Sequence, residues 1–227
     1  MEPIIQTRDS RTNVDIIFDH LYDEITSLGL LPGTKISEAD IAARFGVSRQ
    51  PVRDAFSRLE NMDLVLIRRQ KATEVKRFSL HAITKARFIR AAVESEVLRR
   101  AARECGPAEA ALLEDCLEQQ RTAVAAGDHI EFGVLDYEYH QTLCDIAKVA
   151  FAFDVISAEK AKVDRLCLLG LSKLDRMPDL LADHVAIAAA VRAGNADGAV
   201  EVGMMHLSRL DATIEAIIEQ QSNYFEA

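Results

Sequence analysis

The sequence of 227 residues predicts a mostly α-helical protein built from two domains, at residues 10–78 and 79–222. Three observations support this prediction. Apolar residues recur at helical spacing along most of the chain, and a strand-like pattern is confined to one short stretch before residue 79. Charge is also unevenly distributed. The first 78 residues hold 12 basic and 12 acidic residues, whereas the remainder holds 15 and 24, a net charge of −9.

The first domain is expected to open with an amphipathic helix capped by Asn13. Its apolar face comprises Ile17, Leu21, Ile25 and Leu28. A short helix over 38–45, a glycine turn and a longer helix from Ser48 to about Asn61 should follow. Apolar and β-branched residues on both sides of a polar tip then predict a β-hairpin over 64–78. This order of elements is typical of a winged helix-turn-helix.

A proline near the start of the longest of these helices supports the assignment. With Ser48 as the N-cap, Pro51 is the third helical residue, where the backbone N–H would have no acceptor within the helix. Arg49, Gln50 and Arg53 then point outward from the first turn and a half, the part of a recognition helix that enters the major groove. Arginine can bind guanine there in bidentate fashion, and glutamine can pair with adenine.

A charged helix face is more often simply solvated. Here, however, the basic residues coincide with a G-V-S turn and a basic hairpin, and residues 35–77 carry a local charge of +4 from 10 basic and 6 acidic residues. We therefore expect binding to double-stranded DNA, with some of these side chains holding phosphates. The candidate DNA-contacting residues are Arg44, Ser48, Arg49, Gln50, Arg53, Arg69 and Lys71.

The stretch "GTKISEADIAARFGVSRQPVRDAFSRLENMDLV" resembles the DNA-binding domain of the GntR family of bacterial regulators, and the resemblance spans about residues 14–77. It implies that Arg49, Gln50 and Arg53 contact an operator, and in the family the wing reaches the adjacent minor groove.

Three positions depart from the family pattern. Ala39 stands where relatives often have a base-contacting arginine, Asp63 replaces the usual glycine before the wing, and Gln70 replaces a glycine at the wing tip. The operator sequence and the wing contact therefore do not follow from the resemblance.

The second domain is expected to be a six-helix bundle. Pro107 and Pro178 suit first helical turns, and Asp128 and Asn195 suit N-caps. The predicted helices are 80–104, 108–126, 129–147, 150–172, 179–193 and 196–221.

Three histidines and one aspartate in this bundle point to a metal site. Asp136 and His140 lie one helical turn apart, and His184 and His206 each lie among apolar residues. Such a set suits a divalent transition metal. The alternative is that the histidines are hydrogen-bonded core residues and that the Asp–His pair is a surface pair.

Residues 79–222 are also similar to the helical effector domain of the FadR-like branch of the GntR family, in its six-helix, VanR-like variant. Metal-binding members of that branch carry D-x-x-x-H on one helix and one histidine on each of the last two helices, and "DYEYH", "DHVAI" and "MMHLS" follow this order. The resemblance implies a divalent ion, zinc first and nickel or manganese as alternatives, with positions left for water or a ligand carboxylate. The implied ligands are Asp136, His140, His184 and His206.

The same resemblance implies an effector-binding arginine. Arg90 matches a pocket-facing arginine of the family, and Arg165 is a second candidate. With a guanidinium near the metal, a carboxylate ligand would be held by the metal on one side and by the arginine on the other. Alternatively, Arg90 pairs with Glu94, one turn further along the helix.

We therefore expect a cytoplasmic, homodimeric transcription regulator, acting as a repressor on a pseudo-palindromic operator and controlled by a small organic acid at the metal site. The sequence contains no run of eighteen apolar residues, so no membrane span is predicted. The N-terminus lacks the apolar core of a signal peptide. One alternative is a metal-sensing regulator with the ion as its signal. Another is a metal-dependent enzyme with an activated water, which is disfavoured because no further carboxylate or histidine occupies an obvious general-base position.

Overall fold

The computed structural model describes residues 11–69, 71–167 and 173–226, so Gln70, at the expected wing tip, lies outside the described residues. Contacts divide the chain into two units. The first is Met1–Phe78 together with Asn223–Ala227, and the second is Ser79–Ser222.

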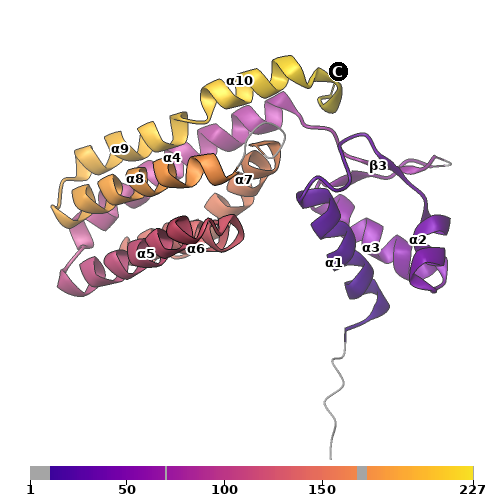
Figure 1. Cartoon of the computed structure of the whole chain (residues 1–227), viewed down its shortest axis with the longest axis horizontal. Coiled ribbons are helices and arrows are strands. Elements are labelled where there is room, and N and C mark those ends of the chain that lie inside the picture. The colour runs from indigo at the N-terminus through magenta and orange to yellow at the C-terminus, as the bar shows by residue number, and fades with distance from the viewer. Residues whose placement is uncertain (1–10, 70, 168–172, 227) are drawn as a thin grey trace, which may run out of the picture. The chain divides into compact units, whose positions relative to one another are not determined.

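The first unit has the predicted order of helices followed by a hairpin (Figure 1). Its sheet is antiparallel with the strand order β1-β3-β2, and the predicted hairpin is formed by β2 and β3. The strand β1 was not predicted, because two residues are too few to show an alternating pattern. The elements are α1 (Asn13–Thr26), β1 (Lys35–Ile36), α2 (Glu38–Phe45), α3 (Arg49–Asn61), β2 (Val65–Leu66) and β3 (Thr73–Val75).

The start and end of α1 differ from the prediction. Thr12, not Asn13, is the N-cap, because its hydroxyl accepts the N–H of Asp15 while the Asp15 carboxylate accepts the N–H of Thr12. At the other end, Ser27 caps the helix and Leu28 has a φ of +63°, so Leu28 lies beyond the helix and is only partly buried. Ile17, Leu21 and Ile25 form the predicted buried face.

The recognition helix α3 begins as predicted. Ser48 is its N-cap in extended conformation, and Pro51 is the third helical residue. Val52, Phe56 and Leu59 are buried in the core that α1, α2 and the sheet share. The outward face of the first turns is therefore fixed by packing on the opposite side of the helix.

The C-terminal residues pack onto the first unit. The N–H of Phe78 donates to the carbonyl of Tyr224 at 2.9 Å, and the N–H of Glu226 donates to the carbonyl of Phe78 at 2.9 Å. The rings of Phe78 and Phe225 are 5.8 Å apart, and both residues are buried. Residues 223–226 are thus part of the first unit, which no sequence pattern had indicated.

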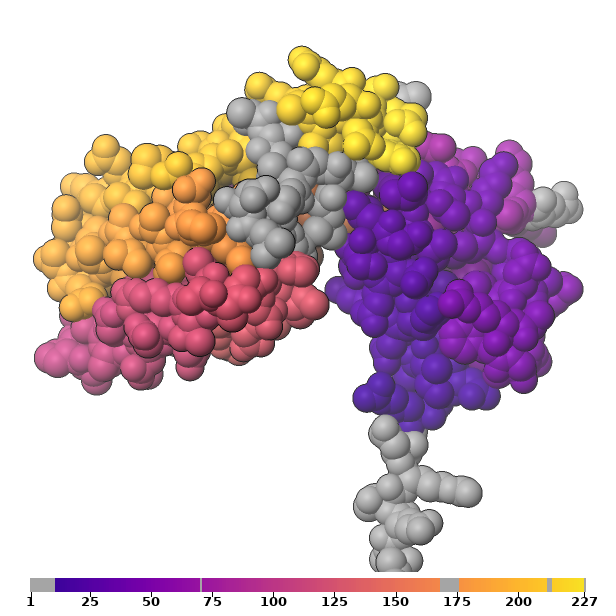
Figure 2. Space-filling view, in the orientation of Figure 1, coloured from indigo at the N-terminus to yellow at the C-terminus, as the bar shows by residue number. Residues whose placement is uncertain are grey.

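The second unit is a helical bundle. Its longest helix, α4, packs against α7 and α9, while α5 packs against α6 and α8. Figure 2 shows one face of this unit, on which α5 and α8 lie side by side. The helices are α4 (Leu80–Glu104), α5 (Pro107–Ala126), α6 (His129–Ile146), α7 (Ala152–Cys167), α8 (Lys173–Arg192), α9 (Ala196–Ser208) and α10 (Asp211–Gln220), followed by the 3-10 turn Ser222–Tyr224. Asp128 and Asn195 are N-caps, as predicted.

Two boundaries in the bundle were predicted wrongly. Pro178 lies inside α8 and not at its first turn, because the helix begins at Lys173 and the apolar periodicity starts only later. The helix predicted over 196–221 is interrupted at Arg209 and Leu210. Both residues keep right-handed helical dihedral angles, so the apolar periodicity continues through the break and does not reveal it.

Candidate functional site

All predicted DNA-contacting side chains are exposed on the first unit, from α2 through α3 to the hairpin. The side chain of Ser48 makes no capping hydrogen bond within the described part of the chain, so its hydroxyl is available to a phosphate. Ala39, the second residue of α2, offers only a methyl group. Asp63, where relatives have glycine, has a φ of +60°, which explains the usual preference for glycine at that turn.

Two of the predicted base-reading side chains are held by carboxylates. The Nε of Arg53 donates to Oε2 of Glu38 at 2.8 Å, and the Nε2 of Gln50 donates to Oδ1 of Asp54 at 2.9 Å. Both pairs are exposed, so water or a base edge can replace the carboxylate at little cost. Arg49 remains the most direct candidate for base contact.

Arg58, further along α3, contacts residues of α1. Its guanidinium lies 4.0 Å from the centre of the Phe18 ring and donates to Asp15 at 2.9 Å. It therefore joins α3 to α1 within the DNA-binding unit.

The four predicted metal ligands lie together in the second unit. His140 on α6, His184 on α8 and His206 on α9 are buried, and their potential ligand atoms all lie within 4.8 Å of one another. The Oδ1 of Asp136, one turn before His140, is 3.4 Å from the Nε2 of His184. The packing of α6, α8 and α9 thus brings together residues up to 70 positions apart in the sequence.

Each histidine is oriented by an acceptor at its Nδ1 atom. The Nδ1 atoms of His140 and His206 lie 3.2 Å and 3.3 Å from carboxylate oxygens of Glu94 and Asp183, respectively. An ionised carboxylate only accepts hydrogen bonds, so both Nδ1 atoms carry the proton. In a neutral ring with this tautomer, the lone pair is on Nε2.

The third histidine is fixed in the same way by an amide. The Nδ1 of His184 is 2.8 Å from Oε1 of Gln120, whose Nε2 donates to the carbonyl of Leu135 at 3.1 Å. This second bond fixes the amide orientation, so Oε1 must accept from Nδ1–H. Burial lowers the pKa of His184 well below its usual value, more than Asp136 raises it, and the ring is therefore neutral.

With the rings in this orientation, the Nε2 lone pairs of two histidines have no hydrogen-bond donor among the described residues. The Nε2 atoms of His140 and His184 are buried and have no hydrogen-bond partner among the residues that the structure describes. The Nε2 of His184 instead faces a carboxylate oxygen of Asp136. Two acceptors facing each other in a buried space are unfavourable unless a proton or a cation lies between them. Three imidazoles and one carboxylate are a donor set that suits a divalent transition metal.

The expected effector arginine is engaged with its neighbour. The Nε of Arg90 donates to Oε1 of Glu94 at 2.8 Å, and both side chains are buried. Burial would raise the pKa of Glu94, but Arg90 and then His140 lower it to about 2, so this carboxylate is ionised. Glu94 thus contacts Arg90 with one oxygen and His140 with the other.

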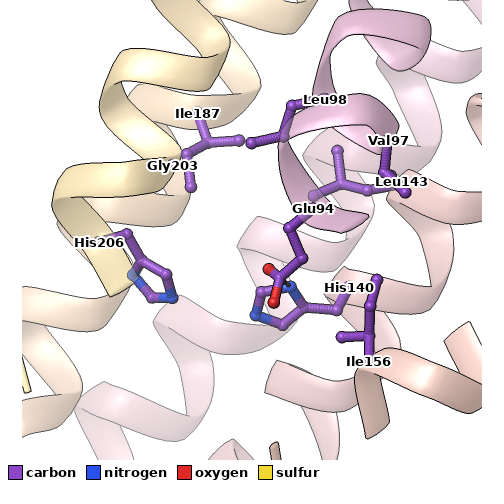
Figure 3. Close-up of a pocket in the computed structure, with 9 residues that line it drawn as sticks. All are labelled: Glu94, Val97, Leu98, His140, Leu143, Ile156, Ile187, Gly203 and His206. Carbon is purple, nitrogen blue, oxygen red and sulfur yellow. Dashed lines mark ion pairs between the residues drawn. The ribbon is translucent and has the colours of Figure 1, made fainter. Parts of the chain in front are cut away.

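The two residues of this ion pair line different cavities. Glu94, His140 and His206 point into the first, which is only about 10 Å³ and has apolar walls (Figure 3). Arg90 lines the second, of about 130 Å³, together with Val163, Met204, Leu207 and other residues. Arg165, the other predicted effector residue, lies partly buried on α7 and lines neither of these two cavities.

Sequence reasoning missed the residues that orient the histidines. Gln120 and Asp183 belong to helices where their polarity could equally mean exposure, and only the packing shows that they are buried. It also missed Lys160 on α7, whose Nζ is 2.7 Å from Oδ2 of Asp136. A lysine in a helix usually lies at the surface, so no pattern marks this one.

Comparison with known proteins agrees with this architecture. Residues 13–75 match the family "Bacterial regulatory proteins, gntR family", and residues 86–209 match the FCD domain. The chain is 34% identical over 209 residues to the HTH-type transcriptional repressor RspR of Escherichia coli (strain K12), covering 92% of both chains.

Two solved structures share the fold. One is a GntR transcriptional regulator from Rhodococcus sp. RHA1, with a TM-score of 0.69 and 22% identity over 91% of this chain and 99% of the other. The other is McbR/YncC from E. coli, with a TM-score of 0.67 and 16% identity over 91% of this chain and 98% of the other. In the described residues, no helix is both long enough and apolar enough to cross a membrane. The chain therefore belongs to the GntR family of bacterial transcription regulators and carries an FCD domain after its winged helix-turn-helix.

Proposed function

We propose that this protein is a cytoplasmic transcriptional repressor whose operator affinity is controlled by a small organic acid bound at a metal site in the FCD domain. Repression is the function in the name of the E. coli relative RspR, which aligns over 92% of this chain. The exposed residues Arg49, Gln50 and Arg53 would read the operator in the major groove. A homodimer would present two such helices to a pseudo-palindromic site.

The observation that carries the metal proposal is the approach of Asp136 Oδ1 to the buried Nε2 of His184 at 3.4 Å. Asp136, His140, His184 and His206 would hold a divalent ion, zinc first and nickel or manganese as alternatives. Bound there, the ion would supply a Lewis-acidic site for a carboxylate. The protein's own contribution is to fix the imidazole tautomers and to exclude bulk water.

Arg90 is the group that would recognise the rest of the acid. Arg90 lines the larger cavity, and in this structure its guanidinium is paired with Glu94, which lines the histidine cavity. An acid entering the site would compete for the guanidinium, so binding would be coupled to a change at Glu94 and at its partner His140. A ligand that changes these contacts in only one conformation of the domain can shift the population of that conformation.

Thermal unfolding of the metal-loaded protein with a panel of small carboxylic and hydroxy acids tests this proposal. Ligand bound only to the folded state raises the midpoint by mass action. We expect a shift with one class of acid that disappears after chelation and in His140→Ala. No shift with any acid, together with a large shift from the metal alone, would contradict an acid effector.

That second outcome would support metal sensing, with the ion itself as the signal. One observation favours this alternative: the cavity beside the histidines has a volume of about 10 Å³, which is room for at most one water, and Arg90 is already paired. A metal could enter such a site without displacing Glu94, whereas an acid could not. Operator binding measured with zinc alone, and with zinc plus each acid, distinguishes the two proposals.

A further inference from the structure

A buried lysine lies against the predicted metal site. Lys160 projects from α7, and its side chain is 9% exposed. Its Nζ is 2.7 Å from Oδ2 of Asp136 and 2.6 Å from Oδ2 of Asp164, and it lies 4.3 Å from the centre of the Tyr137 ring. The hydroxyl of Tyr137 donates to the same oxygen of Asp164 at 3.1 Å, so all four side chains form one network.

The lysine divides the two oxygens of Asp136 between two partners. Oδ2 accepts from Lys160, and Oδ1 faces the Nε2 of His184. The ammonium group of Lys160 lies between two carboxylates, because Oδ2 of Asp164 on the same helix contacts it as well. Only one carboxylate oxygen of Asp136 is therefore free to face the histidines.

We propose that Lys160 is a built-in counter-ion of the histidine cluster, which neutralises Asp136 in the absence of metal and limits how tightly the metal is held. The inference rests on the metal site proposed above and assigns it a further positioning residue. Lys160 lets the domain fold with the site empty, because a lone buried carboxylate among neutral imidazoles would be strongly destabilising. Its positive charge also opposes a cation placed beside Asp136.

The charges around the site indicate which ligand would complete it. Four ion pairs that the structure describes around the site contain four carboxylates and three cations, which together carry a single negative charge. They are Glu94 with Arg90, Asp183 with Arg209, and Asp136 and Asp164 with Lys160. A divalent ion reverses the sign to a single positive charge. The loaded site then favours one anionic group, in agreement with a carboxylate effector.

Lys160→Met tests the inference in the full-length protein, with Lys162→Met as its control. Lys162 lies on the same helix but is 44% exposed and pairs with Glu159, so the control removes the same charge away from the site. Zinc affinity would be measured by competition with a chromophoric chelator. We expect Lys160→Met to bind zinc about tenfold more tightly, because it removes a positive charge that opposes the cation beside Asp136, and to be less stable than the wild type without metal.

A second variant covers the case in which Lys160→Met fails to fold. Asp164 is partly exposed, and Asp164→Asn leaves the ammonium group of Lys160 to Asp136 alone. Zinc binding should then weaken, while Glu159→Gln, which removes a carboxylate from the same helix, should have no such effect. With cobalt as the probe, the visible bands of Lys160→Met should weaken, because both oxygens of Asp136 become available and the coordination number rises.

The outcomes separate this inference from the proposed function. If the wild type binds zinc and Lys160→Met binds it equally or more weakly, the counter-ion role is wrong and the metal site stands. Unchanged zinc binding in Asp164→Asn would count against the role in the same way. If neither the wild type nor Lys160→Met binds zinc or cobalt, the metal site and the role of Lys160 fail together.

Discussion

The Nε2 of His184 and the Oδ1 of Asp136 face each other at 3.4 Å in the interior of the FCD domain. Gln120 keeps the proton of His184 on the other ring nitrogen, so neither atom of this pair has a hydrogen to share. Proteins rarely bury two acceptors against each other. The arrangement is understandable if a cation is the missing partner.

Metal removal should therefore lower stability. At a free zinc concentration of 100 times Kd, binding stabilises the folded state by about 2.7 kcal/mol, which corresponds to roughly 5–10 °C in the unfolding midpoint for a chain of this size. We expect this shift in the wild type and its loss in His184→Ala, measured by thermal unfolding with zinc and with EDTA. His129→Ala, which removes an exposed histidine, should keep the full shift.

Loss of the amide that orients His184 should weaken metal binding. In Gln120→Leu, Nδ1 of His184 loses its acceptor, and the ring is free to change its tautomer or rotate. Zinc affinity should fall by about 10- to 100-fold, as for other hydrogen-bond partners of metal ligands. Gln119→Leu, at the exposed neighbouring position, is the matched control for loss of an amide. Equal affinities for the two variants would show that the hydrogen bond of Gln120 does not support the site.

The sequence was sufficient to predict that Asp136 and the three histidines lie together, but not what surrounds them. Asp136 and His140 are one turn apart, and each of the other two histidines lies within an apolar helix, so local patterns identified all four. The hydrogen-bond and ion-pair partners of these four residues come from other helices. Lys160, for example, is buried only because α7 packs against α4 and α6, and no local pattern in α7 contains that information.

The same limit applies to the fold. The start of α3 could be predicted because Ser48 and Pro51 impose local constraints on the backbone. The break after Ser208 and the pairing of Phe78 with Phe225 could not. The first leaves the backbone nearly helical, and the second joins residues that are far apart in the sequence.

Arg49 should contribute to the recognition of one base pair. If it binds a guanine in bidentate fashion, Arg49→Ala should weaken operator binding by about 1–3 kcal/mol and relax specificity at that position. Wild-type protein would first select its operator from a pool of random duplexes, and fluorescence anisotropy would then compare the two proteins on that operator and on single-base variants. Lys71→Ala should instead weaken binding to all DNA sequences alike. It should also reduce the slope of the logarithm of the binding constant against the logarithm of the salt concentration by about one, as expected for the loss of one phosphate contact. If Arg49→Ala weakened all duplexes equally, Arg49 would be a phosphate contact.

The last residues of the chain should stabilise the DNA-binding unit through Phe78. Phe225→Ala removes the ring that packs on Phe78, and for a buried ring this change destabilises by about 3 kcal/mol. The N–H of Phe78 donates to Tyr224, so its hydrogen exchange should accelerate in Phe225→Ala and become fastest when residues 223–227 are deleted. Tyr224→Ala keeps the backbone hydrogen bonds and the Phe225 ring, and serves as the control with near wild-type protection. Unchanged exchange at Phe78 after the deletion would mean that the C-terminal residues do not hold this segment in solution.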